Sequence, residues 1–260
     1  MLLSQSRGNA KLRKSELAQY RIMGLSLAPG SPQVCPHATA GCRAVCVGEG
    51  GMARVFPEIS ASRAMKTAFL RQKPDEFRDQ LRREIAQQLA LADNVGEQLV
   101  LRMNTFSDLD WSDIARQFPQ VIFYDYTKIH SRWLKIRSGE WPTNYALTFS
   151  WSENPRHQEW CARILSGGGN VAMAFHHAGR GYCGHGAYRQ ELPGFWTIGG
   201  ERHPVLDGDM SDLRFLDSGA DAWFSPKPGK GWIVGLRLKA ATEADRQKAI
   251  ETGFSAEYRP

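Results

Sequence analysis

The sequence predicts an α/β fold, a compact and irregular TIM-like (β/α) barrel that forms one domain over residues 1–260. Short apolar runs, rich in β-branched and aromatic residues, begin roughly two dozen residues apart and are bounded by Gly, Pro, Asn or Ser. Stretches compatible with helices lie between them, and this alternation predicts parallel strands joined by right-handed crossovers. A closed barrel is the simplest arrangement of seven or eight such strands. An open doubly wound sheet is the alternative.

The elements follow one another in a regular order along the chain. A first strand is expected early, and four regular strands separated by helices follow a long amphipathic helix. Three further strands are expected in the last third. The predicted strands lie at 25–28, 99–104, 121–127, 145–152, 170–175, 195–198, 204–207 and 233–238. The predicted helices lie at 74–93, 113–118, 128–139 and 154–169.

Two of these helices have clear signals. In the helix at 74–93, apolar residues recur every four positions along one face, at Phe77, Leu81, Ile85 and Leu89. In the helix at 154–169, Asn154 is a good N-cap and Pro155 suits the first helical position. Gly167 suits the end of that helix. Asp110 is expected to cap the helix that begins near Trp111.

The composition is that of a globular protein with a basic balance. Hydrophobic residues make up 42% and charged residues 23%, and the formal net charge is +6. No apolar run reaches the about 20 residues of a membrane span, and residues 1–24 form a basic segment without the pattern of a signal peptide. We therefore expect a cytoplasmic protein without membrane association. Basic residues that repeat in 1–24 and in the following helical region predict contacts with a nucleic-acid backbone, at Lys11, Arg13, Lys14, Arg63 and Lys66.

Three of the five cysteines lie in one short loop, at Cys35, Cys42 and Cys46. In a reducing compartment, clustered cysteines favour metal binding over disulfides. The loop predicts a structural zinc site whose fourth ligand is His37, Cys183 or His185. An iron–sulfur cluster is the less favoured alternative, and thiols without a metal are the third. Cys161, within a predicted helix, is expected in the core.

Polar side chains gather where the predicted strands end. In a barrel these ends meet at one mouth, where active sites are built. Asp125 lies within its strand, on the face of Val121 and Phe123, where a carboxylate is costly unless it has partners. The residues expected at this site are Asn104, Phe106, Asp108, Asp125, Lys128, Ser150, Glu153, His176, His177, Asp207 and Asp209.

Several motifs in a fixed order resemble a family of small phage- and plasmid-encoded proteins. They are GNAKL, LSLAPG followed by CPHATAGCRAVC, LRMNTFSDLDW, FPQVIFYDYTK, NYALTFSWSE and VLDGDMSDLRF followed by IVGLRLK. Part of that family resembles the phage DNA-guanine transglycosylases of the DpdA type, distant relatives of tRNA-guanine transglycosylase. The resemblance implies a barrel fold, a structural zinc, double-stranded DNA as partner and exchange of guanine for a 7-deazaguanine base such as preQ0. In this chain the cysteine trio comes earlier and has a different spacing than in the tRNA enzymes.

The chemistry of base exchange assigns roles to the predicted residues. A carboxylate that attacks C1′ of the sugar holds the strand together while one base leaves and another arrives. Asp108 is the expected nucleophile, and Asp125 or Asp209 is the expected second carboxylate or base-recognition residue. The remaining strand-end residues are expected to bind substrate.

Three alternatives stay open at the level of the sequence. One is a non-catalytic nucleic-acid-binding metalloprotein of phage or plasmid replication. Another is an iron–sulfur enzyme of the radical type. The third is a nuclease that holds Mg²⁺ with Asp108, Asp207 and Asp209.

Overall fold

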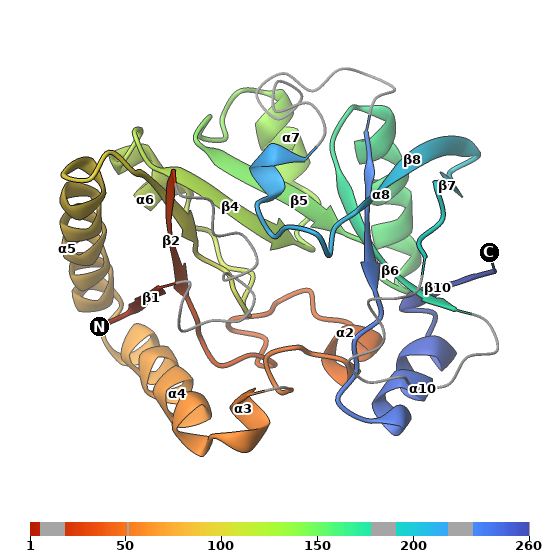
Figure 1. Cartoon of the computed structure of the whole chain (residues 1–260), viewed down its shortest axis with the longest axis horizontal. Helices are drawn as coiled ribbons and strands as arrows, with labels where there is room; N and C mark the ends of the chain where they lie inside the picture. Colours follow the sequence, from red (N-terminus) through yellow and green to blue (C-terminus); the bar gives the residue numbers. More distant parts are fainter. Residues whose placement is uncertain (6–18, 51, 178–190, 218–230, 260) are drawn as a thin grey trace.

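The computed structural model describes residues 1–5, 19–50, 52–177, 191–217 and 231–259 (Figure 1). Within these residues the chain forms one sheet of ten strands in the order β1-β2-β3-β4-β5-β6-β9-β8-β7, and β10 pairs with β6. The strands are β1 (Leu3–Gln5), β2 (Tyr20–Leu25), β3 (Gln98–Arg102), β4 (Ile122–Thr127), β5 (Tyr145–Ser150), β6 (Val171–His177), β7 (Phe195–Ile198), β8 (Glu201–Asp207), β9 (Ile233–Arg237) and β10 (Ser255–Tyr258).

The prediction of a closed barrel is wrong. The strands from β2 to β6 advance one by one in parallel, as barrel strands do, and β9 and β8 continue in parallel. Closure would require a last parallel strand to pair with β2. Instead β9 lies between β6 and β8, and the path ends at the antiparallel strands β1 and β7. The sheet is therefore open and mixed, although mostly parallel.

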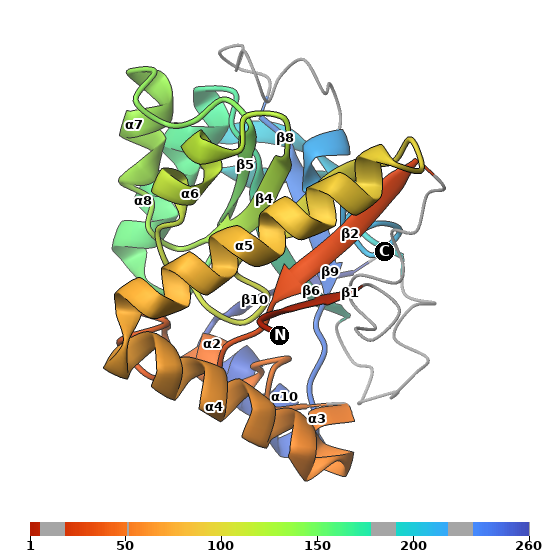
Figure 2. The same cartoon turned by 90° about the vertical axis from the view of Figure 1, so that its left-hand side faces the viewer.

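Helices cover the outer side of this curved sheet (Figure 1). Figure 2 shows α5 running along the sheet beside β2, with α4 and α3 below it. The short helix α2 and the late helix α10 lie together near the carboxyl-terminal ends of the strands. The helices are α2 (Ala40–Ala44), α3 (Met52–Val55), α4 (Pro57–Gln72), α5 (Pro74–Asp93), α6 (Ser112–Gln117), α7 (Arg132–Arg137), α8 (Pro155–Ser166) and α10 (Glu243–Glu251).

The two faces of the sheet pack against different parts of the chain. The helix side holds the larger core, to which β3 contributes Leu99 and Leu101. On the inner side, Val100 and Tyr124 pack in a smaller cluster with Leu213 and Phe215. These last two belong to a single chain segment that contains the 3-10 turn η3 (Arg214–Leu216).

Charged groups tie this segment to the inner face of the sheet. The buried guanidinium of Arg102 on β3 pairs with Asp212, and it lies 5.0 Å from the ring centroid of Tyr126 on β4. Burial lowers the pKa of Arg102, but the charge of Asp212 outweighs this and raises it. The segment thus occupies, in the part of the chain described here, the space that a barrel would fill with its own strand side chains.

Most predicted elements are confirmed within a few residues at each end. The helix at 74–93 matches α5, and α8 begins after Asn154, whose side chain accepts from the amide of Arg156. Asp110 accepts from the amide of Ser112 (2.9 Å), one residue ahead of the cap position. The strand predicted at 25–28 is wrong, because β2 ends at Leu25. Sequence patterns missed β1, β10, α2, α3 and α10. In the described parts of the chain, no helix combines the length and apolar character required to cross a bilayer.

Candidate active site

Asp108 lies in the loop after β3, at the carboxyl-terminal edge of the sheet. Its Oδ1 accepts from Oγ1 of Thr127 (2.8 Å) and Nη1 of Arg132 (2.7 Å). Its Oδ2 accepts from the backbone amide of Lys128 (2.7 Å). The side chain is 13% exposed, and that of Arg132 is 4% exposed. We call Asp108, Thr127, Lys128 and Arg132 the Asp108 cluster, in which three donors bind one carboxylate group.

The loop that presents Asp108 is folded around the side chain of Asn104. Oδ1 of Asn104 accepts from Ser107 Oγ (2.8 Å), the amide of Leu109 (2.9 Å) and Trp111 Nε1 (3.3 Å). Nδ2 of Asn104 donates to the carbonyl of Leu109 (3.0 Å) and to Asp125 (3.1 Å). One amide side chain therefore fixes both sides of the loop. Asn104 has a structural place here, whereas the sequence predicted a substrate contact.

Asp125 supports this loop from the interior of the protein. It is fully buried and accepts from the amide of Asn104 (2.7 Å) and the hydroxyl of Tyr145 (2.6 Å). Burial raises the pKa of Asp125 to about 7, although the bonds from Tyr145 and Asn104 act in the opposite direction. Asp125 thus supports the Asp108 loop from the buried interior.

The cysteine loop docks onto the same edge of the sheet. Glu153, just beyond β5, accepts from Thr39 Oγ1 (2.8 Å) and from the amide of Gly41 (2.8 Å). The carbonyl of Val34 accepts from the amide of Asp108 (2.7 Å), so this loop and the Asp108 loop are joined directly. A Cβ on Gly41 would lie 2.4 Å from Cβ of Phe254, which leaves room only for glycine.

The thiols and Lys128 share one electrostatic environment. Burial raises the pKa of Cys35, a hydrogen bond with the backbone of Gly30 lowers it, and the electrostatic influence of Cys46, Cys42 and Asp108 raises it. Burial lowers the pKa of Lys128, but Cys42, Asp108 and Glu153 outweigh this, so the pKa of Lys128 is raised. Lys128 is therefore a firmly protonated cation next to Asp108, within a group of acidic side chains.

Three histidine rings form a column beside this group. His37 stacks on His157 (centroids 5.8 Å apart), and His157 lies 4.7 Å from His130. Burial and the neighbouring His157 lower the pKa of His130 to about 4. Burial, His37 and Lys128 lower the pKa of His157. Because His157 also bonds Ser152 Oγ (2.7 Å), the inner two rings are neutral packing groups at pH 7.

The zinc prediction is not supported by a ready set of ligands. Among the residues that the structure describes, no three His, Cys, Asp or Glu side chains are gathered as metal ligands. His37 faces His157, and Sγ of Cys35 donates to the carbonyl of Phe106 (3.3 Å). The other candidates for the fourth ligand, Cys183 and His185, lie outside the described residues. Zinc stays a prediction, and no step below depends on it.

A second group of carboxylates lies at the ends of β8 and β9. Asp207 accepts from both terminal nitrogens of Arg237 (2.8 and 2.9 Å). Asp209 accepts from the amide of Arg237 (2.9 Å) and pairs with Lys239. Burial raises the pKa of Asp209, but Lys239 and Arg237 outweigh it and lower this pKa. We call these four residues the Asp209 cluster.

The other predicted residues are distributed over several places. His176 on β6 bonds Ser255 Oγ on β10 (2.9 Å), and His177 contacts the ring of Tyr258. Ser150 ends β5, and its carbonyl lies 3.2 Å from Nε2 of His130. The structure thus brings together Asp108, Lys128, Glu153 and the cysteine loop. The Asp209 cluster and His176 make the contacts given above with other partners.

The predicted DNA contacts on α4 turn inward. Arg63 donates to the carbonyl of Gly48 (2.5 Å), and its guanidinium lies 4.1 Å from the ring centroid of Phe106. Lys66 donates to the carbonyl of Leu2 (2.8 Å). Burial lowers the pKa of both groups. These cations stabilise the fold at the positions where the sequence predicted phosphate contacts. Lys11, Arg13 and Lys14 lie outside the described residues.

Comparison with known proteins places the chain in a family. The model of the family described as Gene product 88 matches residues 1–253. The chain belongs to the Gene product 88 family. No curated protein and no solved structure matches it.

In this Gene product 88 family member, sequence patterns missed the side chains that hold its carboxylates. Arg132 and Thr127 hold Asp108, and Arg237 holds Asp207 and Asp209. A weak signal exists for Arg237 and Lys239, which alternate along IVGLRLK on one strand face. No comparable signal marks Arg132, because the pattern KIHSRWLKIR leaves open which of its basic residues turns inward.

Proposed function

We propose that this Gene product 88 family member modifies DNA, exchanging guanine for a 7-deazaguanine base of the preQ0 type through an ester between Asp108 and deoxyribose. It would act on double-stranded DNA in the cytoplasm, the host cytoplasm for a phage-encoded protein. The family motifs suggest the reaction class. The Asp108 cluster supports the proposal, because it contains a carboxylate in the loop after β3, at the carboxyl-terminal edge of the sheet.

The arrangement of donors around Asp108 is the observation that carries the proposal. Oδ1 is occupied by Thr127 and Arg132, whereas Oδ2 accepts from one backbone amide alone. Each carboxylate oxygen has two lone pairs, so Oδ2 keeps one for attack on carbon. Arg132 pairs with Oδ1, so it does not occupy Oδ2.

The reaction balances with Asp108 and solvent water. Oδ2 of Asp108 bonds to C1′ as the C1′–N9 bond of guanine breaks, and the electron pair leaves with the purine, which takes up one proton from water. N9 of the incoming base then gives one proton to water and attacks C1′, which releases the carboxylate. The ammonium of Lys128 stabilises the negative charge that develops on either purine. Asp209 is a poor proton donor because its pKa is lowered.

Incorporation of a labelled base tests the proposal. Duplex DNA is incubated with the protein and labelled preQ0, and digested nucleosides are analysed by mass spectrometry. We expect the modified nucleoside with the wild-type chain and at least about a hundredfold less with Asp108→Asn. Asp113→Asn, an exposed acid paired with Arg78, is the matched control and should act like wild type.

A second measurement separates a nucleophile from a structural acid. Without an acceptor base, wild-type protein should form a denaturant-resistant adduct with DNA, and Asp108→Asn should not. Thermal melting of both proteins shows whether the variant is folded. An Asp108→Asn variant that is folded and exchanges bases at the normal rate would disprove the assignment, and wild-type protein without incorporation would disprove the function.

A non-catalytic DNA-binding role is the second candidate, and one observation favours it. Three donors contact Asp108, as expected for an acid that fastens a loop. In that case, the wild-type protein would bind DNA but form neither the adduct nor the modified nucleoside.

A further inference from the structure

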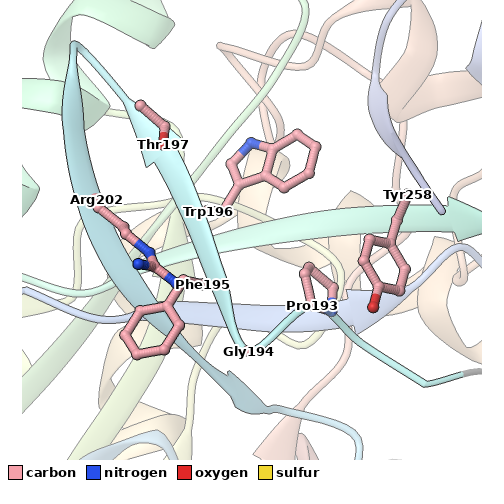
Figure 3. Close-up of a pocket in the computed structure, with 7 residues that line it drawn as sticks. All are labelled: Pro193, Gly194, Phe195, Trp196, Thr197, Arg202 and Tyr258. Carbon is pink, nitrogen blue, oxygen red and sulfur yellow. The ribbon is translucent and has the colours of Figure 1, made fainter. Parts of the chain in front are cut away.

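An open groove lies at the opposite end of the sheet from β1, along β7 and the end of β10. Its volume is about 440 Å³, within the range of small-ligand sites. Figure 3 shows its lining, which combines three aromatic rings with one guanidinium. The lining residues are Pro193, Gly194, Phe195, Trp196, Thr197, Arg202 and Tyr258.

Two aromatic side chains of the groove, Trp196 and Tyr258, each contact another ring of the protein. Trp196 packs edge-on against Phe175 of the core, with centroids 5.3 Å apart. Tyr258 makes a similar edge contact with His177 at 6.4 Å. Rings fixed in this way lose little side-chain entropy when a ligand stacks on them. The Trp196 and Tyr258 rings are therefore preorganised for contact with a planar ligand.

Phe195 and Arg202 form the exposed half of the groove. Phe195 is 51% exposed. The guanidinium of Arg202 lies over its ring, 4.2 Å from the centroid (Figure 3). Among the described residues Arg202 has no ion-pair partner, whereas the nearby Arg259 pairs with Glu257. Arg202 is thus a cation that can still meet an anion.

We propose that this groove binds unpaired DNA, with a base stacked on the exposed ring of Phe195 and a phosphate on Arg202. Binding sites for single strands combine these two elements, aromatic faces and a backbone cation. The formal net charge of +6 favours a polyanion over an acidic or neutral peptide of equal shape. The inference extends the proposed function by its DNA partner only, and it does not depend on Asp108.

Fluorescence anisotropy with a labelled oligothymidylate of about ten nucleotides tests the groove. Phe195→Ala should weaken binding about tenfold, since one base loses its stacking partner. Arg202→Ala should reduce the slope of log affinity against log salt by about 0.7, the value for one phosphate of a single strand. Phe56→Ala, at a position 45% exposed at the start of α4, and Arg83→Ala, at an exposed position of α5, are the matched controls and should bind like wild type.

The competing occupants give different results. Equal affinity of Phe195→Ala and wild type overturns the inference, as does equal affinity for an abasic oligomer of the same length. Binding of a proline-rich peptide to the groove without competition from the oligomer also overturns it. If Phe195→Ala binds the oligomer weakly while wild type incorporates no base, the groove inference is supported and the transglycosylase proposal fails. If wild type incorporates the base while Phe195→Ala binds the oligomer normally, the transglycosylase proposal stands and the groove inference fails.

Discussion

The Asp108 cluster and the Asp209 cluster lie at the same edge of one sheet, yet they hold carboxylates in different ways. In the Asp209 cluster, two acids meet Arg237 and Lys239, and one guanidinium binds both oxygens of Asp207. In the Asp108 cluster, one acid meets Arg132 through a single oxygen. The first arrangement neutralises its acids locally. The second leaves Oδ2 of Asp108 with one hydrogen bond, from the backbone amide of Lys128.

The support behind each cluster differs as well. The Asp209 cluster rests on two neighbouring strand ends, so its partners are close in the pairing of β8 and β9. The Asp108 loop depends on a buried chain of bonds from Tyr145 to Asp125 to Asn104. The comparison shows that a carboxylate in a loop depends on buried hydrogen bonds beneath that loop. Carboxylates at paired strand ends are held by their own ion pairs.

Removal of the Asp125 carboxyl group should have the largest effect on stability. Asp125→Ala leaves the amide of Asn104 and the hydroxyl of Tyr145 buried without an acceptor, so we expect a loss of about 3 kcal/mol in the free energy of unfolding. Denaturant unfolding measures it. Asp93→Ala, an exposed acid at the end of α5, is the control. A loss below about 1 kcal/mol would show that the loop does not depend on Asp125.

The Asp209 cluster should respond less strongly and in another pH range. Asp209→Asn should cost about 2 kcal/mol at pH 7, because Arg237 and Lys239 lose a charged partner. The pKa of Asp209 is lowered in the folded state, so its stabilisation is present above about pH 4 and is lost as the pH falls through the folded pKa. The variant should therefore lack part of the acid-induced loss of stability. Equal acid sensitivity of both proteins would contradict this.

Asp125 should show the reverse pH dependence. Its pKa is raised to about 7, so the folded protein retains a proton that the unfolded chain releases near pH 4. Its contribution to stability is full below about pH 4 and declines as the pH rises to about 7. Relative to wild type, Asp125→Asn should have a flatter profile between these values. Unfolding at several pH values tests it, and parallel profiles would refute the assigned shift.

A smaller effect is expected where the cysteine loop docks. Glu153→Gln weakens the bonds from Thr39 and Gly41, with an expected cost of about 1 kcal/mol. Cys42 and Cys46 should then react faster with a thiol reagent, which is followed by absorbance. Glu159→Gln, on α8, serves as the control. An unchanged reaction rate would mean that Glu153 does not hold the loop.

The smallest effect is expected at the rim of the Asp108 cluster. Lys135 and Asp110 are 3.8 Å apart, and both side chains are about half exposed. Lys135→Ala should change the free energy of unfolding by less than about 0.5 kcal/mol. Thermal melting tests it at low and high salt. A larger loss would show that cations beyond Arg132 contribute to holding this region.

Sequence periodicity predicted the local elements well because their signals are local. The apolar spacing of α5 and the Asn154, Pro155 and Gly167 signals of α8 act within a few residues of each other. The strands β3 to β6 and their parallel order follow from the same alternation. The polar strand ends also predicted that Asp108, Lys128 and Glu153 would meet at one edge.

Only the tertiary structure decided whether the sheet closes, and which polar residue presents a charge. Closure depends on strand pairing far apart in the chain, and here the segment with Asp212 and Phe215 fills the inner face. The roles of Asn104, Asp125, Arg63 and Lys66 depend on burial and on partners up to 64 residues away. Residue spacing carries no such information, because the energy of a buried polar group is set by what surrounds it in three dimensions.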